Sequence, residues 1–134
     1  MIPEPGRALT DLALRLLFNV APQTTNTFAA ADAGLVGQLV MTLGQEFERA
    51  VATRMQDIDE LKALLKDASP TPERTRYLAQ IPASLHLKDV NVVHDAGMRL
   101  ISALHAEVET TNDVSNRRIW SFLRAHSERH KFES

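Results

Sequence analysis

The chain contains no cysteine and only 5 glycines and 6 prolines among its 134 residues. Without cysteine, it has neither disulfide bonds nor thiolate-ligated metal sites. Glycine and proline interrupt regular structure, so their low number, together with few runs of β-branched residues, favours helix over sheet. The absence of cysteine also fits a reducing compartment, and we predict a cytoplasmic protein.

The sequence also lacks a strong charge of one sign and a long apolar run. Its formal net charge is −2, so no basic field gathers phosphates, and we predict no nucleic-acid partner. No segment has the roughly 18 consecutive apolar residues of a membrane span. Asp11 and Arg15 interrupt the apolar stretch near the amino end. We therefore predict no export signal and no membrane partner.

A long helical pattern dominates what is present. Apolar residues recur at steps of three and four, the period of a helix with one buried face. A helix over about residues 27–67 would be roughly 60 Å long. Gly44 and Thr53 mark the positions where a kink or a break would fall. The apolar positions are Phe28, Ala31, Leu35, Leu39, Leu43, Phe47, Val51, Met55, Ile58, Leu61 and Leu65.

The remaining helices follow from their stop and start signals. Pro22 is predicted to end a first helix that begins near Arg7, because proline lacks an amide donor and clashes with the preceding turn. Thr71 and Pro72 predict the start of a short helix. Two further helices are predicted over about residues 88–110 and 114–130.

The predicted fold is all-α. We expect an antiparallel bundle of four principal helices plus one short helix, including the unusually long one. The bundle is predicted to be a single domain of residues 1–134. In it, residues 1–6 would form an irregular lead-in and residues 131–134 a frayed tail.

Three candidate ligand-binding residues lie on the long predicted helix. Gly34 and Gly37 belong to a strip of small residues that also holds Met41. Small side chains let another helix come close, or leave room for a ligand. Close helix packing is the simpler interpretation, and a ligand pocket is the alternative.

The other three candidates are His94, His105 and Trp120. The two histidines lie within about 20° of each other around their predicted helix, but roughly 16 Å apart along its axis. They are therefore too distant to share one metal ion. We expect such histidines at the edge of an apolar stripe to pair with backbone or a carboxylate. Trp120 lies beside the chain's one basic patch, which consists of Arg117, Arg118, Arg124, Arg129 and Lys131.

Two groups of residues, a pair of histidines and a set of five carboxylates, raise the question of a metal site. His126 and His130 are four residues apart on the last predicted helix, which suits a transition metal, but the spacing shows no third ligand. We expect them to belong to a solvated helix end, where positive side chains suit the helix dipole. We predict no metal site, no cofactor and no catalytic residue. The carboxylates considered as metal ligands are Glu46, Glu48, Asp57, Asp59 and Glu60.

The length of the main helix suggests a function. A helix longer than its neighbours leaves part of its apolar stripe uncovered unless a second copy or another protein covers it. We predict a small non-enzymatic helical protein that acts through protein–protein interaction as a homodimer. One alternative is a bundle that binds a small apolar or acyl-type molecule beside Gly34, Gly37, Met41 and His94. The other is a metal-dependent enzyme using Glu46, Glu48 and His105.

Overall fold

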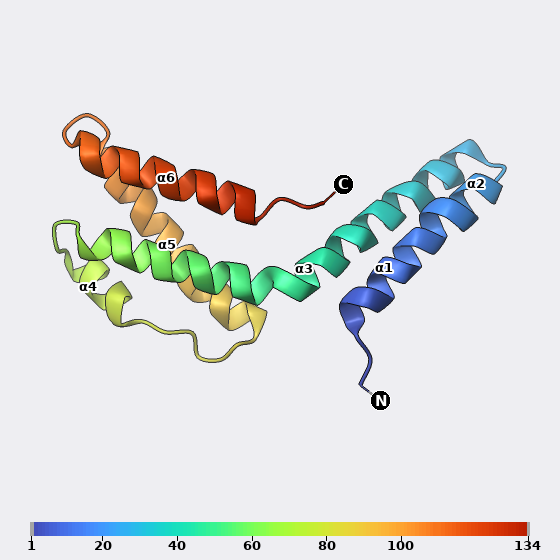
Figure 1. The fold of residues 1–134 in the computed structure, drawn as a ribbon, viewed down its shortest axis with the longest axis horizontal. Coiled ribbons are helices and arrows are strands. Elements are labelled where there is room, and N and C mark those ends of the chain that lie inside the picture. The colour runs from blue at the N-terminus through green and yellow to red at the C-terminus, as the bar shows by residue number, and fades with distance from the viewer. Residues whose placement is uncertain (1, 134) are drawn as a thin grey trace. The chain divides into compact units, whose positions relative to one another are not determined.

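The computed structural model describes residues 2–133, and every regular element in that range is a helix. Met1 of the predicted lead-in and Ser134 of the predicted tail lie outside the described residues. The all-α fold class and the single long helix are confirmed. The elements are α1 (Pro5–Arg15), the π-helical turn η1 (Leu16–Val20), α2 (Ala21–Gln23), α3 (Thr27–Lys66), α4 (Pro72–Ala79), α5 (Leu87–Val108) and α6 (Asp113–Arg129) (Figure 1).

Polar side chains start three of these helices. Asn26, Thr71 and Asn112 precede α3, α4 and α6. Each accepts a hydrogen bond from the backbone amide three residues later, at distances between 3.0 and 3.2 Å. These bonds satisfy amides that have no partner within the helix. The three loops therefore fix where the helices begin.

The first helical segment differs from the prediction at both ends. It begins at Pro5 rather than near Arg7, because proline is tolerated in the first turn, where its missing amide is not needed. The prediction that Pro22 ends the segment was wrong. The π-helical turn η1 precedes it, and Pro22 then lies in the first turn of α2, which continues to Gln23.

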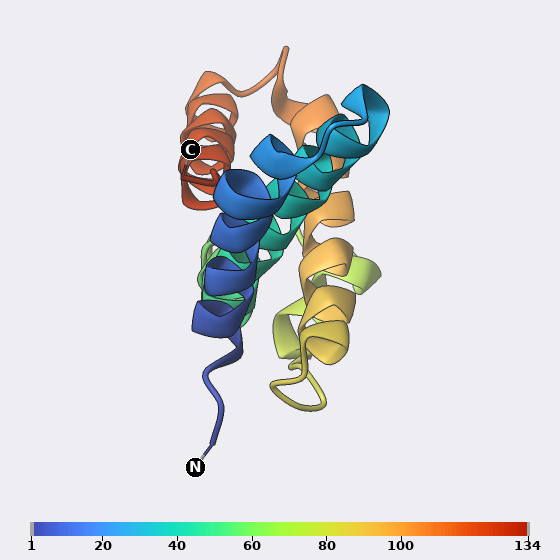
Figure 2. The ribbon, with the colours of Figure 1, turned by 90° about the vertical axis from the view of Figure 1, so that its right-hand side faces the viewer.

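The chain divides into two compact units. The amino-terminal unit consists of residues 2–50 with residues 132–133, and the second unit consists of residues 51–131. In the amino-terminal unit, α1 and η1 return alongside the first part of α3 (Figures 1 and 2). Glycines on α3 permit this approach: a Cβ atom on Gly37 would lie 2.8 Å from Leu17 Cγ, and one on Gly44 would lie 3.1 Å from the Gly6 carbonyl oxygen.

Two glycine substitutions in this unit should have opposite effects. Gly34 faces open space, so Gly34→Ala should raise the free energy of unfolding by about 1 kcal/mol through helix propensity. Gly37→Ala should lower it by about 1–2 kcal/mol, because the new methyl group overlaps Leu17. Urea unfolding of both variants followed by circular dichroism checks the pair. Equal effects would contradict the described contact of η1 with α3.

The second unit holds the main apolar core. Its helices are the carboxyl-terminal part of α3 together with α4, α5 and α6. Tyr77 of α4 packs against α5 at Gly97, which is the one glycine of this unit. The buried core residues are Ile58, Leu61, Leu65, Tyr77, Val90, Val93, Ile101, Leu104, Ile119 and Phe122.

Candidate functional site

The amino-terminal part of α3 carries an uncovered apolar face. We define this apolar face as Phe28, Leu35, Leu39, Leu43 and Phe47, each more than half exposed, with Phe28 at 88%. At 100° per residue, the five positions span about 120° of the helix. Gly37 and Gly44, where α1 and η1 contact α3, lie roughly 130° from the centre of this face. The first helices thus cover the glycine side of α3 and leave the leucine side bare.

The same stripe is covered in its second half. Val51 and Met55 are partly buried, whereas Ile58, Leu61 and Leu65 are at most 2% exposed. The helices of the second unit supply that cover. The uncovered residues of the α3 stripe therefore lie in the amino-terminal unit.

A buried polar cluster lies in the second unit. The Asp57 side chain is fully buried on α3. Its Oδ2 atom lies 2.9 Å from His94 Nε2, 2.8 Å from His126 Nδ1 and 2.7 Å from His130 Nε2. The four ligand-type atoms all lie within 4.8 Å of one another, so these residues could hold a metal ion.

An arginine holds the other oxygen of Asp57. Arg129 donates from Nε to Asp57 Oδ1 at 3.0 Å, and its two terminal nitrogens donate to the Glu60 carboxylate at 2.9 and 2.7 Å. The bonds to Glu60 raise the pKa of Arg129. Burial raises the pKa of Asp57, but the hydrogen bonds from the three histidines outweigh it and hold that pKa well below its usual range. Asp57 is thus ionised at neutral pH.

The predicted ligand residues lie in different surroundings. Gly34 faces open space and Gly37 contacts η1, while Met41 is partly buried on α3. His94 belongs to the cluster around Asp57. Of these four residues, the structure places His94 beside the Asp57 carboxylate, a group that can bind a metal ion.

His105 and Trp120 contact each other instead. His105 Nε2 lies 3.0 Å from Asn116 Oδ1, and the Trp120 ring meets the His105 ring edge to face at 5.4 Å. His105 is not among the four residues grouped around Asp57. Its surroundings are those of a histidine that joins α5 to α6.

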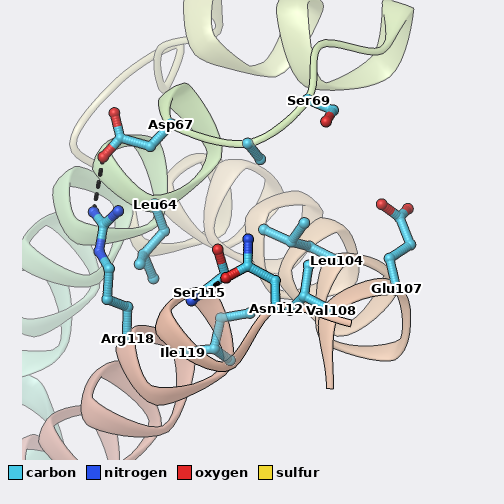
Figure 3. Close-up of a pocket in the computed structure, with 11 residues that line it drawn as sticks. Leu64, Asp67, Ser69, Leu104, Glu107, Val108, Asn112, Ser115, Arg118 and Ile119 are labelled. Carbon is cyan, nitrogen blue, oxygen red and sulfur yellow. Dashed lines mark hydrogen bonds and ion pairs between the residues drawn. The ribbon is translucent and has the colours of Figure 1, made fainter. Parts of the chain in front are cut away.

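The second unit also contains a small cavity of about 120 Å³, bordered by α3, α5 and α6 (Figure 3). Leu64, Leu104 and Ile119 line it, and an ion pair of 2.9 Å between Asp67 and Arg118 lies at its border. The volume suits a few water molecules rather than a typical organic ligand. None of the six predicted ligand residues lines this cavity.

The sequence interpretation placed His126 and His130 on a solvated turn and missed their connection to Asp57. Both side chains are instead about three-quarters buried against that carboxylate. One signal was available. Asp57 lies four residues before Leu61, so a carboxylate falls on the buried side of the long helix. A charge at such a position calls for buried partners.

Comparison with known proteins adds no further identification. No model of a protein family, no curated protein and no solved structure matches this chain.

Proposed function

We propose that the protein acts in the cytoplasm through protein–protein interaction, as a homodimer in which two copies join through the apolar face of α3. The observation that carries the proposal is the exposure of all five residues of that face. A contiguous exposed apolar surface larger than a few hundred Å² marks an interaction site in a folded protein. The occupant we propose is a second copy of the same chain.

The exposed area fits such a dimer. A fully exposed phenylalanine presents roughly 200 Å² and a leucine somewhat less, so the five residues together present about 600 Å². A stable interface buries about 800 Å² on each partner, which includes the polar rim. Phe18 of η1 is 70% exposed and adds to the apolar surface of the same unit.

The charge pattern favours a second copy over a charged partner. Between Phe28 and Gln45, Asp32 is the only charged residue. A neutral apolar face complements another neutral apolar face, and a two-fold axis lets one face bind its own copy. Two α3 helices crossing antiparallel near residue 38 would place Phe28 opposite Phe47 of the second copy. Leu39 would then lie next to the axis.

A single charge should separate the copies. Leu39 is exposed in the protomer, so Leu39→Glu should preserve the fold. In the dimer it would bury two carboxylates near the axis, and we expect the dissociation constant to rise at least ~100-fold. Sedimentation velocity at micromolar concentration, with circular dichroism as a folding check, measures this. Gln38→Glu, which lies off the apolar face, is the matched control and should remain dimeric.

Cross-linking tests the orientation. The natural chain has no cysteine, so a single Leu39→Cys substitution can form only an intermolecular disulfide. We expect rapid oxidation of Leu39→Cys to a covalent dimer and little oxidation of Gln38→Cys. At about 100 µM even a weak dimer would form. Wild-type protein that still sediments as a 14.9 kDa monomer at that concentration would refute the homodimer.

A membrane is the competing occupant. Among the described residues one helix, α3, is long and apolar enough to cross a membrane by length and composition alone, and a single helix of this kind is weak evidence. Flotation with phosphatidylcholine vesicles distinguishes the two. Protein that stays in solution as a dimer supports the proposal, and protein that floats with the vesicles without dimerising overturns it.

A further inference from the structure

The cluster around Asp57 brings three imidazole nitrogens to one carboxylate oxygen. A carboxylate oxygen has two lone pairs, yet three imidazole nitrogens lie within 2.9 Å of Asp57 Oδ2. The other oxygen is already occupied by Arg129. The four atoms converge on one another.

We propose that Asp57, His94, His126 and His130 bind one divalent transition-metal ion, with Zn²⁺ as the best fit. Imidazole nitrogen suits zinc and its neighbours in the first transition row, and a carboxylate oxygen completes a four-coordinate set. In a tetrahedral zinc site the ligand atoms lie about 3.3 Å apart. Here the four atoms already lie within 4.8 Å of one another, so small side-chain rotations complete the geometry.

The outer contacts are those of a metal site. Ligating carboxylates are themselves hydrogen-bonded in such sites, which fixes the direction of the free oxygen. Arg129 does this for Asp57, because it holds Oδ1 at 3.0 Å and leaves Oδ2 facing the histidines. Glu60 in turn fixes Arg129 through two hydrogen bonds.

The local charge also favours a cation. Arg129 alone would repel one, but Asp57 and Glu60 supply two negative charges against its single positive charge. The two carboxylates and the guanidinium together therefore carry one net negative charge. Asp95 lies 3.5 Å from His94 Nδ1 and adds a second negative charge at the edge of the cluster. A dication neutralises this excess.

The ligand set distinguishes between classes of metal. Mg²⁺ and Ca²⁺ prefer shells made of oxygen atoms, and this cluster offers three nitrogens and one oxygen. We therefore expect Zn²⁺ and Co²⁺ to bind and Mg²⁺ to fail to compete. This proposal does not depend on self-association, since all four residues belong to the second unit.

Calorimetric titration of untagged full-length protein with Zn²⁺, after dialysis against EDTA, tests the site. We expect one ion per chain. His126→Ala and His130→Ala should each raise the dissociation constant at least ~100-fold, since loss of even an outer-shell partner costs 10- to 100-fold. His105→Ala is the matched control: it removes a histidine from α5 that pairs with Asn116, and binding should be unchanged.

A second readout reports coordination directly. Co²⁺ in the wild-type protein should show the intense visible absorption bands of a four-coordinate ion, and these should weaken in His130→Ala. Saturating Zn²⁺ at about 100 times its dissociation constant should raise the Tm by roughly 10 °C. The proposal is overturned if wild-type protein takes up no Zn²⁺ at micromolar concentration, if the His126→Ala/His130→Ala variant binds as tightly as wild type, or if Mg²⁺ competes equally.

Discussion

Replacement of Asp57 by alanine should lower the free energy of unfolding by about 4 kcal/mol in metal-free buffer. The side chain is fully buried and accepts hydrogen bonds from three histidines and Arg129. Its removal leaves those groups facing an unfilled space with no carboxylate to accept from them, while the cost of burying them remains. The helices α3, α5 and α6 all contribute side chains to the cluster. The substitution should therefore destabilise the whole second unit.

Chemical unfolding in the presence of EDTA measures this effect without a contribution from bound metal. Asp59→Ala is the matched control, because Asp59 lies two residues away on α3 and is exposed. That variant should differ from wild type by no more than ~0.5 kcal/mol. An Asp57→Ala variant as stable as Asp59→Ala would show that the cluster contributes nothing to the fold.

The second large effect is expected at Gly97. Its Gly97→Ala variant should lose about 2–3 kcal/mol of stability, although alanine is the better helix former. The new Cβ atom would lie 2.7 Å from Tyr77 Cζ and 2.9 Å from Leu61 Cδ1, and it would overlap the Tyr77 hydroxyl group as well. Both neighbours are buried core residues, so neither can move aside freely.

Tyr77→Phe supplies the test of this explanation. The buried Tyr77 hydroxyl has no hydrogen-bond partner among the described residues, and burial raises its pKa to about 12. Removing the hydroxyl should therefore raise stability by about 1 kcal/mol. In the double variant, Gly97→Ala should cost about 1 kcal/mol less than it does alone, because part of the overlap is gone. Strict additivity would place the strain of Gly97→Ala elsewhere.

The helices could be predicted from the sequence because their signals are local. The apolar period from Phe28 to Leu65 predicts α3 almost to the residue, and Thr71 with Pro72 predicts the start of α4. The continuation through Pro22 was missed because a π-helical turn leaves no pattern that apolar periodicity detects. The sequence also could not predict which half of the α3 stripe is covered, because this depends on where the other helices lie.

The cluster could be predicted only in part. The four-residue spacing of His126 and His130 is a local signal, and a carboxylate four residues before Leu61 is another. The contacts of Asp57 with His126 and His130 join residues that are 69 and 73 positions apart in the chain. No period within one helix encodes such a pairing. His94 and His105 looked equivalent for the same reason, yet only His94 faces Asp57.

The partial exposure of two histidines has a kinetic consequence. His126 and His130 keep about a quarter of their side-chain surface in contact with water, whereas Asp57 keeps none. An ion held there can exchange with solution by stepwise release from the outer two side chains, while α3 and α5 stay folded. Exchange should then be much faster than global unfolding, so occupancy would follow the free concentration of the ion in the surroundings.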